Sequence, residues 1–424
     1  MRKANLVLAA ALAAAGVTAV TTTALLTPAT AIAEEQKKKQ ATPKIGAKMI
    51  KPLKTAQDAI GVKDWTTALA ALAEARAIEP KSPYEAFMVD ELSWYALVQT
   101  KDYKGAAESL ERSVNAGFLP EADLTQRYKA LAQIEYQIQD YPKAVEYGSK
   151  YLAASPGSQD VAALVAQSKY LQKDYAGALA TVDQVVAGVA KPDEQLLQIG
   201  LRCAFEMKDR PATIRSLESL VRYYPAKKYW EDLLNNQLYL TKSERDLRAL
   251  YRLIDDTNTL DRPEEYAEAA AVLMTGGFPT EARQILEQGT TAGVFKGDSL
   301  TRAQTDLQRA RTAADADRKE LTGADAALAA AKSGNEMVAM GKLFFSVGEY
   351  GKAADAIQKG LAKGGVSDVD DANALLGIAQ VRAGKGKEAF PALDAVKDPA
   401  LAQVMRYWKL YVESTTAAAP AATG

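Results

Sequence analysis

The side chains that most often carry enzyme chemistry are scarce in this sequence. Its 424 residues include no histidine, which excludes serine–histidine and cysteine–histidine nucleophile pairs, histidine metal ligands and histidine general bases. Cys203 is the single cysteine, so it cannot form an internal disulfide. Its neighbours indicate a buried small side chain, with pairing to another chain as the alternative. We therefore expect no enzyme, no cofactor and no bound metal ion.

Two short motifs are similar to known ligand-binding loops but lack residues that those loops require. Residues 334–342 contain glycines and a lysine, but the glycines are too far apart for a phosphate loop, and Leu343 stands where that loop has serine or threonine. Asp315 and Asp317 begin like a calcium loop, yet Glu320 replaces the glycine of its sharp turn. A pair of carboxylates can cleave a glycan without histidine, and so a carboxylate hydrolase remains an open alternative.

A repeated segment organises most of the chain. In each copy, an aromatic residue follows a short polar turn, and the five positions 65, 103, 141, 175 and 210 give steps of 38, 38, 34 and 35 residues. Position 210 is a weaker copy, with arginine in place of the ring. An acidic residue precedes the ring, and alanine follows it three positions later, in the segments that begin at Asp64, Asp102, Asp140, Asp174 and Glu349, with a weaker copy at Lys385.

This pattern resembles the tetratricopeptide repeat family over residues 46–400. The resemblance implies two antiparallel helices per unit. Small residues let the two helices approach closely, the ring fills the gap near the turn, and a following proline ends the second helix. Small residues also recur nine positions before the ring, at Ala56, Ala132, Ala166, Gly341 and Gly377.

We predict an all-α fold, an α-α superhelix or solenoid of about ten tetratricopeptide-like helix pairs. Eight pairs are recognisable, and one of them has Phe278 at the ring position. The distances from position 210 to Phe278 and from Phe278 to Tyr350 are each twice the length of a repeat, which implies degenerate pairs near Glu244 and Ala314. Residues 46–232 would form a regular N-terminal array, and residues 233–413 a mixture of degenerate and regular units. Separate domains in place of the degenerate pairs are the alternative.

The N-terminus has the pattern of a secretory signal peptide over residues 1–33. Arg2 and Lys3 are followed by an apolar run over residues 6–20 and then by small residues that end at Ala33. Cleavage after Ala33 would deliver the protein to the periplasm without a stable membrane span. Retention of the apolar run as a membrane anchor is the alternative.

Two further terminal segments differ in composition from the repeats. Residues 34–45 are basic and predict a flexible leader, and residues 414–424 are rich in small residues and predict a disordered tail. The chain as a whole carries 52 lysines and arginines against 53 acidic residues, which offers no overall field to attract nucleic acid. We expect no nucleic-acid partner.

The family resemblance implies that the first helix of each unit lines a concave groove. On these helices, polar or aromatic side chains recur eight and five positions before the ring, and residues three apart share a helix face. The alternative for the rings is packing between units. The candidate groove residues are Gln57, Tyr95, Gln133, Tyr136, Gln167, Tyr170, Arg202 and Phe205.

Amides and rings in one strip suit an extended polymer, because amides pair with backbone or hydroxyl groups and rings supply flat apolar contact. We expect the groove to bind a protein or peptide of the cell envelope, so that the chain serves as a scaffold for assembly or interaction. Recognition of a cell-wall glycan is the second hypothesis.

Overall fold

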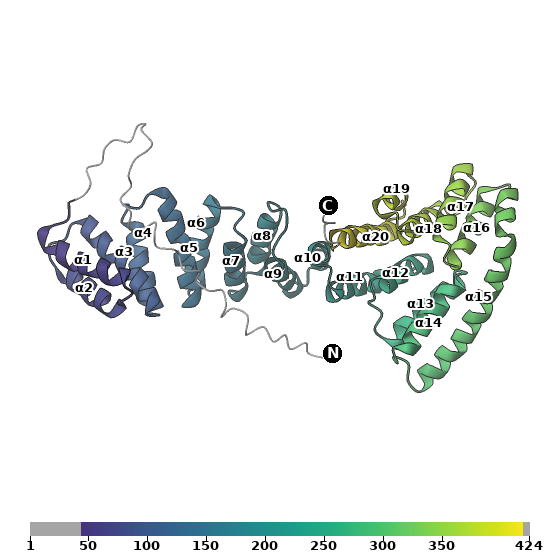
Figure 1. Ribbon diagram of the computed structural model, residues 1–424, viewed down its shortest axis with the longest axis horizontal. Coiled ribbons are helices and arrows are strands. Elements are labelled where there is room, and N and C mark those ends of the chain that lie inside the picture. The colour runs from purple at the N-terminus through teal and green to yellow at the C-terminus, as the bar shows by residue number, and fades with distance from the viewer. Residues whose placement is uncertain (1–43, 419–424) are drawn as a thin grey trace.

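The computed structural model describes residues 44–418, and over this range it contains helices and no strand (Figure 1). The predicted all-α class is therefore confirmed for the described part of the chain. The expected signal peptide at 1–33 and nearly all of the leader at 34–45 lie outside the described residues, and both stay predictions.

The first ten helices form five consecutive pairs, stacked side by side in an extended array (Figure 1). In each pair a short turn joins a first helix to a second helix, which packs against it. The pairs are α1 (Ala47–Gly61) with α2 (Trp65–Ala77), α3 (Pro83–Gln99) with α4 (Tyr103–Asn115), α5 (Glu121–Gln137) with α6 (Tyr141–Ala154), α7 (Gln159–Leu171) with α8 (Tyr175–Val186), and α9 (Glu194–Glu206) with α10 (Arg210–Tyr223).

The turn inside each pair has the same hydrogen bonds, and these explain the repeated aspartate. In the first turn, Lys63 adopts a positive φ of 61°, its N–H donates to the Ile60 carbonyl, and the N–H of Asp64 donates to the Ala59 carbonyl. This arrangement ends the first helix. The aspartate then caps the second helix, because its carboxylate accepts the backbone N–H three residues later, at 2.9–3.2 Å for Asp64, Asp102, Asp140, Asp174 and Asp209.

The small residues of the repeat lie where the two helices of a pair meet. The alanines three positions after the ring, namely Ala68, Ala106, Ala144 and Ala178, are fully buried. A Cβ atom added at Gly341 would lie 2.4 Å from Ile357 Cγ1, and one added at Gly377 would lie 2.3 Å from Leu393 Cδ2. The packing role predicted for these positions is therefore confirmed.

One of the two inferred pairs is present. Helix α12 begins at Glu244, at the predicted place, and pairs with the preceding helix. The boundary predicted between residues 232 and 233 falls inside the helix that precedes α12, and the regular array of helix pairs ends earlier, with α10 at Tyr223. The helices of this region are α11 (Lys227–Leu240), α12 (Glu244–Asp256), α13 (Pro263–Thr275) and α14 (Pro279–Thr291).

The second inferred pair, near Ala314, is wrong. A single helix of 33 residues, α15 (Asp298–Ala330), runs through that position along the outer edge of the C-terminal half (Figure 1). Alanine, arginine and glutamate favour helix over this stretch, and it contains no proline that could end the helix. Ala314 is buried on the face of α15 that packs against the rest of the chain.

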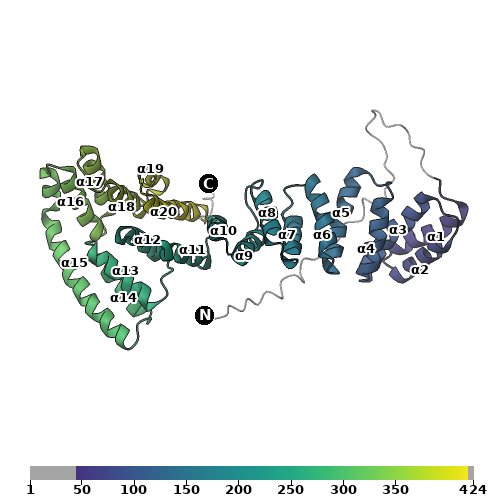
Figure 2. The same cartoon turned by 180° about the vertical axis from the view of Figure 1, so that it is seen from behind.

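The last helices fold back on the middle of the chain, so that contacts between distant helices are added to the predicted stacking of neighbouring pairs. Helix α20 packs against α10, α12 and α18, so that residues 227–418 form a closed body beside the extended array, as the rear view also shows (Figure 2). These last elements are α16 (Gly334–Ser346), α17 (Tyr350–Lys363), α18 (Val369–Arg382), the 3₁₀ helix η2 (Gly386–Ala389), α19 (Phe390–Asp394) and α20 (Pro399–Ala418).

Burial of one face of α20 holds this closure. Trp408 is fully buried, and its Nε1–H donates to the Ala249 carbonyl of α12 at 3.0 Å. Ion pairs join Arg406 to Glu218 and Arg222 to Glu413. The start of the tail expected at residue 414 is also wrong, because α20 continues to Ala418 and Ser414 is buried. Residues 419–424 lie outside the described part.

Candidate functional site

All eight predicted groove residues lie on first helices. Gln57 belongs to α1, Tyr95 to α3, and the others to α5, α7 and α9 in pairs. The first helices of neighbouring units contact each other, α5 with α7 and α7 with α9. The face that these helices share is therefore continuous from the third unit to the fifth.

The structure brings together three of the predicted residues across two units. Arg202 Nη2 on α9 donates to Gln167 Oε1 on α7 at 3.0 Å, and its guanidinium group lies 5.3 Å from the centre of the Tyr170 ring. The Tyr170 hydroxyl donates to Glu206 Oε1 at 3.3 Å. The contacts of Arg202 with Gln167 and with the Tyr170 ring both cross from α7 to α9, and they hold the guanidinium group in one orientation on this face.

Three predicted tyrosines are half-buried and pack against the rings at the turns. Tyr136 lies 5.8 Å from Tyr141, and Tyr170 lies 5.2 Å from Tyr175, between ring centres. Tyr95 contacts the ring of Trp65 in the preceding unit at 5.8 Å. Burial is the main cause that raises the pKa of Tyr136 and of Tyr170 above the usual value for tyrosine. These rings therefore serve packing, whatever else they contact.

Two aromatic side chains on the same row are largely open to solvent. Phe205 is 73% exposed, and Tyr239, five positions before the start of α12, is 69% exposed. Tyr239 is not among the predicted groove residues, although it lies five positions before Glu244, where the start of a second helix was inferred. Arg210 lies over the Tyr239 ring at 5.1 Å and Lys242 at 5.4 Å. We refer to Tyr170, Phe205 and Tyr239 as the aromatic row.

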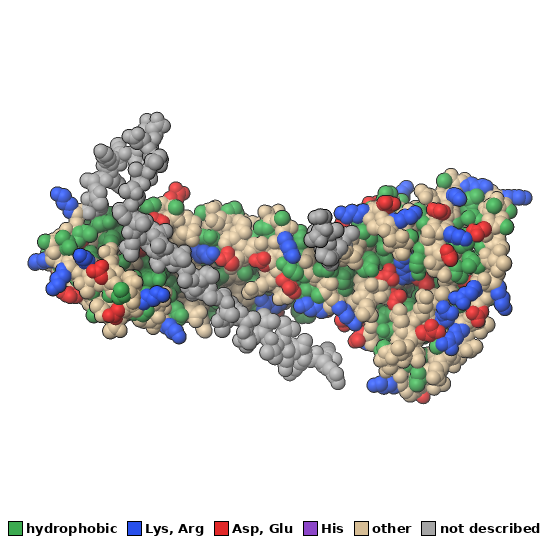
Figure 3. All heavy atoms as spheres, viewed as in Figure 1, with side chains coloured by type: hydrophobic (Ala, Val, Ile, Leu, Met, Phe, Trp, Pro, Cys, Tyr) green, Lys and Arg blue, Asp and Glu red, His purple; other side chains and the backbone are tan. Residues whose placement is uncertain are grey.

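The remaining predicted residues stand apart from these contacts. Gln133 on α5 is exposed, and Gln57 on α1 is half-buried. Neither takes part in the Arg202 hydrogen bonds. On the face drawn in Figure 3, basic and acidic side chains are interspersed, so that a partner would meet both signs of charge there.

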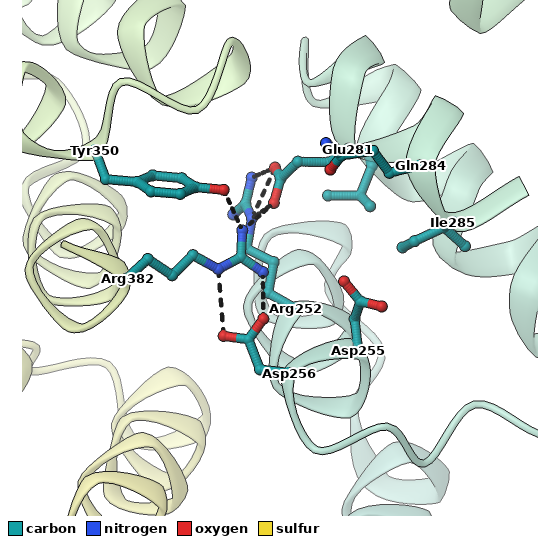
Figure 4. Close-up of a pocket in the computed structure, with 9 residues that line it drawn as sticks. Arg252, Asp255, Asp256, Glu281, Gln284, Ile285, Tyr350 and Arg382 are labelled. Carbon is teal, nitrogen blue, oxygen red and sulfur yellow. Dashed lines mark hydrogen bonds and ion pairs between the residues drawn. The ribbon is translucent and has the colours of Figure 1, made fainter. Parts of the chain in front are cut away.

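A cavity of about 240 Å³ lies in the closed C-terminal body, where sequence reasoning placed no site. Its walls come from α12, α13, α14, α17 and α18, and Figure 4 shows the side chains of the two arginines, Asp256, Glu281 and Tyr350 pointing toward one another. The residues that line it are Arg252, Asp255, Asp256, Leu273, Glu281, Gln284, Ile285, Tyr350 and Arg382.

Two arginines and two carboxylates form a buried network at the back of this cavity. Both oxygens of Glu281 accept from Arg252, at 2.7–3.0 Å, and Arg382 Nη1 donates to Glu281 Oε1 at 2.6 Å. Arg382 also pairs with Asp256 at 2.9 and 3.2 Å. Burial acts to raise the pKa of Glu281, but the two guanidinium groups outweigh it, and the pKa lies below its usual value.

Aromatic rings hold Arg252 in place. Its guanidinium carbon lies 4.1 Å from the centre of the Phe278 ring and 4.7 Å from that of Phe345. A charge at this depth is stable only when it is paired, as it is here by Glu281. The network therefore joins α12, α14 and α18 through fixed contacts.

Asp255 is the carboxylate of this cavity that forms no ion pair in the described part of the chain. Burial raises its pKa to about 6, while Arg382 and the Gln288 side chain lower it in part and Asp256 and Glu281 add to the increase. Figure 4 shows the carboxylate on α12 apart from the arginine network.

Three carboxylates in one cavity bear on the hydrolase alternative. Glycoside cleavage needs one protonated acid and one carboxylate free to act as base or nucleophile. Asp255 has the raised pKa of an acid, but Asp256 and Glu281 are both paired with guanidinium groups, so neither carboxylate is free to act as base or nucleophile. The geometry of the described residues favours a structural or binding role for this network.

Two further observations concern metal ions and membranes, over the described residues 44–418. No group of three or more acidic or cysteine side chains there is placed to hold a metal ion. Across the same range, none of the helices has the length and apolar character needed to cross a bilayer.

No protein-family model matches the chain, and no match was found among curated proteins. Solved structures do resemble it. YrrB, described as a TPR protein with an unusual peptide-binding site, is 13% identical, with a TM-score of 0.35 over 43% of this chain and 89% of that one. A tetratricopeptide repeat protein from Parabacteroides merdae is 13% identical, with a TM-score of 0.29 over 79% of this chain and 100% of that one.

A third match is the TPR2AB domain of yeast Sti1 in its pHSP90 complex, which is 13% identical, with a TM-score of 0.24 over 69% of this chain and 99% of that one. At these identities the likeness concerns the fold alone. The repeated turn, the capping aspartates and the buried alanines are features of this chain itself. On the geometry of its own helix pairs, the chain has the tetratricopeptide-repeat fold.

Proposed function

We propose that the chain is a scaffold that binds a protein or peptide partner along the first helices of its N-terminal array. The observation that carries this proposal is the exposure of Phe205 on α9, the last first helix of the array, and of Tyr239 at the equivalent repeat position on α11, the next first helix along the chain. Exposed rings in one row mark an interaction surface, since a partner that covers them removes apolar area from water.

The polar residues beside the row suit a polypeptide partner. Arg202 is held by Gln167 and by the Tyr170 ring, so it loses little freedom when it donates a further hydrogen bond. Gln133 is exposed on α5 and offers both a donor and an acceptor to a peptide backbone. A glycan could use the same rings and amides, and it is the second ligand that the experiment below distinguishes.

We also propose that the protein acts in the periplasm, with partners in the bacterial cell envelope. The support is the sequence of residues 1–33, with its basic start, apolar run and small residues before the expected cleavage site. The scaffold proposal does not depend on this location, because it is based on the exposed side chains of the first helices and on the contact between α7 and α9.

A pull-down from envelope extract tests the proposal. The variant Phe205→Ala with Gln133→Ala removes one exposed ring and one exposed amide, and we expect it to recover less of at least one protein that the wild type binds. The matched control, Val369→Ala with Gln308→Ala, changes an exposed apolar residue and an exposed amide in the closed body. Equal recovery by all three proteins would refute the surface, and recovery of glycan instead of protein would favour the second ligand.

A further inference from the structure

The charges on the walls of the C-terminal cavity do not balance. Two guanidinium groups, of Arg252 and Arg382, face three carboxylates, of Asp255, Asp256 and Glu281. With all five ionised, the sum is two positive against three negative charges, a net charge of −1. A buried net charge is unfavourable unless a counter-charge approaches it.

The surplus charge belongs to Asp255. Both arginines are already engaged, Arg252 with Glu281 at 2.7 Å and Arg382 with Glu281 at 2.6 Å and Asp256 at 2.9 Å. An anionic ligand would have to break one of these pairs to gain a cation. Asp255 has a hydrogen bond with the Gln288 side chain but no ion pair among the described residues, so a cationic ligand can pair with it without breaking an ion pair.

The other walls define the shape of such a ligand. Leu273 and Ile285 supply apolar surface, and Gln284 and the Tyr350 hydroxyl supply hydrogen-bonding groups. The cavity volume of about 240 Å³ leaves room for a small organic molecule. The described residues gather no set of three ligands for a metal ion, so the geometry favours an organic cation over an inorganic one.

We propose that this cavity binds a small organic monocation, an alkylammonium or alkylguanidinium group, whose charged head pairs with Asp255 while its alkyl part lies against Leu273 and Ile285. The same head group occurs in free amines and in the lysine or arginine side chain of a peptide. This site is separate from the aromatic row, and its failure would leave the scaffold proposal untouched.

Isothermal titration of the full-length protein with n-butylammonium tests the site. We expect saturable one-to-one binding, no binding of n-butanol, which has the same length without the charge, and weakening by at least about tenfold in Asp255→Asn, where the charge-assisted bond is lost. Asp315→Asn makes the same chemical change at an exposed position of α15 and should bind like the wild type.

Protonation gives a second readout on the unmodified protein. The titratable and charged groups around Asp255 come from every helix of the cavity. They are Asp256 and Arg252 from α12, Tyr266 from α13, Glu281 from α14, Tyr350 from α17 and Arg382 from α18, and the Gln288 side chain of α14 is hydrogen-bonded to Asp255. Among the carboxylates, Asp255 has the raised pKa of about 6, so n-butylammonium should bind more weakly as the pH falls through that value.

The source of the head group is distinguished by a parallel titration with acetyl-lysine amide. Binding as tight as that of n-butylammonium supports a peptide side chain, and much weaker binding supports a free amine. The site is overturned if the wild type shows no saturable binding of n-butylammonium, or if Asp255→Asn binds it as tightly as the wild type does.

Discussion

Two carboxylates of the same cavity respond to burial in opposite directions. Glu281 is paired with two arginines, so its pKa is lowered in spite of its burial. Asp255 lines the same cavity as these arginines but has no ion pair, and burial raises its pKa to about 6. At neutral pH, Glu281 is therefore stable as an anion, whereas Asp255 is an anion at a cost to the folded state.

Replacing Asp255 with asparagine should stabilise the free protein at about pH 7.5. The folded-state pKa of about 6 lies above the ordinary value of 3.8, so ionisation favours the unfolded chain as the pH rises through this window. With solvent screening at a half-buried group, we expect Asp255→Asn to gain about 1–3 kcal/mol in the free energy of unfolding. Urea denaturation at about pH 7.5 and about pH 4.5 checks this.

The sign of the pH dependence is the decisive part of that prediction. The gain should shrink at the lower pH, because wild-type Asp255 is then protonated in the folded state and the two side chains are both neutral there. Asp315→Asn serves as the control. A gain that is equal at the two pH values would contradict the raised pKa.

Few residues of the cavity could be predicted from the sequence. Arg252, Asp255 and Asp256 lie in a stretch that is visibly rich in arginine and aspartate, yet this composition is equally typical of a solvated helix. Tyr350 and Arg382 come from units about a hundred residues later. A repeat pattern describes contacts between neighbours along the chain, and it carries no signal for contacts that depend on the chain turning back on itself.

At the scale of the helix pair, the repeat pattern predicted more. Helix α12 begins where the spacing required, although its unit has no ring at the turn. The spacing argument failed at Ala314 because residues 298–330 form a single helix. This stretch contains no proline and does not form the turn with a capping aspartate found at Asp64 and Asp174. A pair needs a specific turn as well as the correct length of chain.

A larger side chain at a buried alanine should separate the two helices of a pair. Ala178 is fully buried between α7 and α8, whereas Ala180 on the same helix is exposed. We expect Ala178→Leu to lower the free energy of unfolding by about 1–3 kcal/mol through overpacking, and Ala180→Leu to change it by less than about 0.5 kcal/mol. Thermal or chemical denaturation measures both, and equal effects would contradict the assigned phase of the repeat.

At the scale of the whole molecule, an extended array is joined to a closed body. The array, from α1 to α10, exposes the face of its first helices, while α20 covers parts of α10 and α12 and completes the body that contains the cavity (Figure 1). The sequence predicted the array because its contacts are local. Closure by α20 depends on burial of side chains such as Trp408 and Tyr407. The sequence of α20 shows that these side chains are apolar, but it does not show which helices they pack against.

Removing the buried ring of α20 should open the closed body. Trp408→Ala deletes a fully buried side chain and its hydrogen bond to Ala249, and we expect a loss of about 3–5 kcal/mol. Hydrogen exchange followed by mass spectrometry should show faster exchange in α12, α18 and α20 and unchanged exchange in α1 to α6. Faster exchange spread evenly over all helices would argue against a separate closed body.

Export can be checked from the mass of the mature protein. Cleavage after Ala33 would leave Glu34 as the first residue. We expect the protein expressed from its full sequence in a bacterial host to be recovered from the periplasmic fraction with that N-terminus. An intact Met1 on protein held in the membrane fraction would support the anchor alternative instead.

The binding face itself is tested most directly by site-specific photo-cross-linking. A benzoylphenylalanine placed at Phe205, in the aromatic row, should cross-link in envelope extract to the same partner that the wild type recovers. The same residue placed at Ala180, exposed on a second helix, should not. Cross-links to that partner from position 180, with none from position 205, would contradict the account.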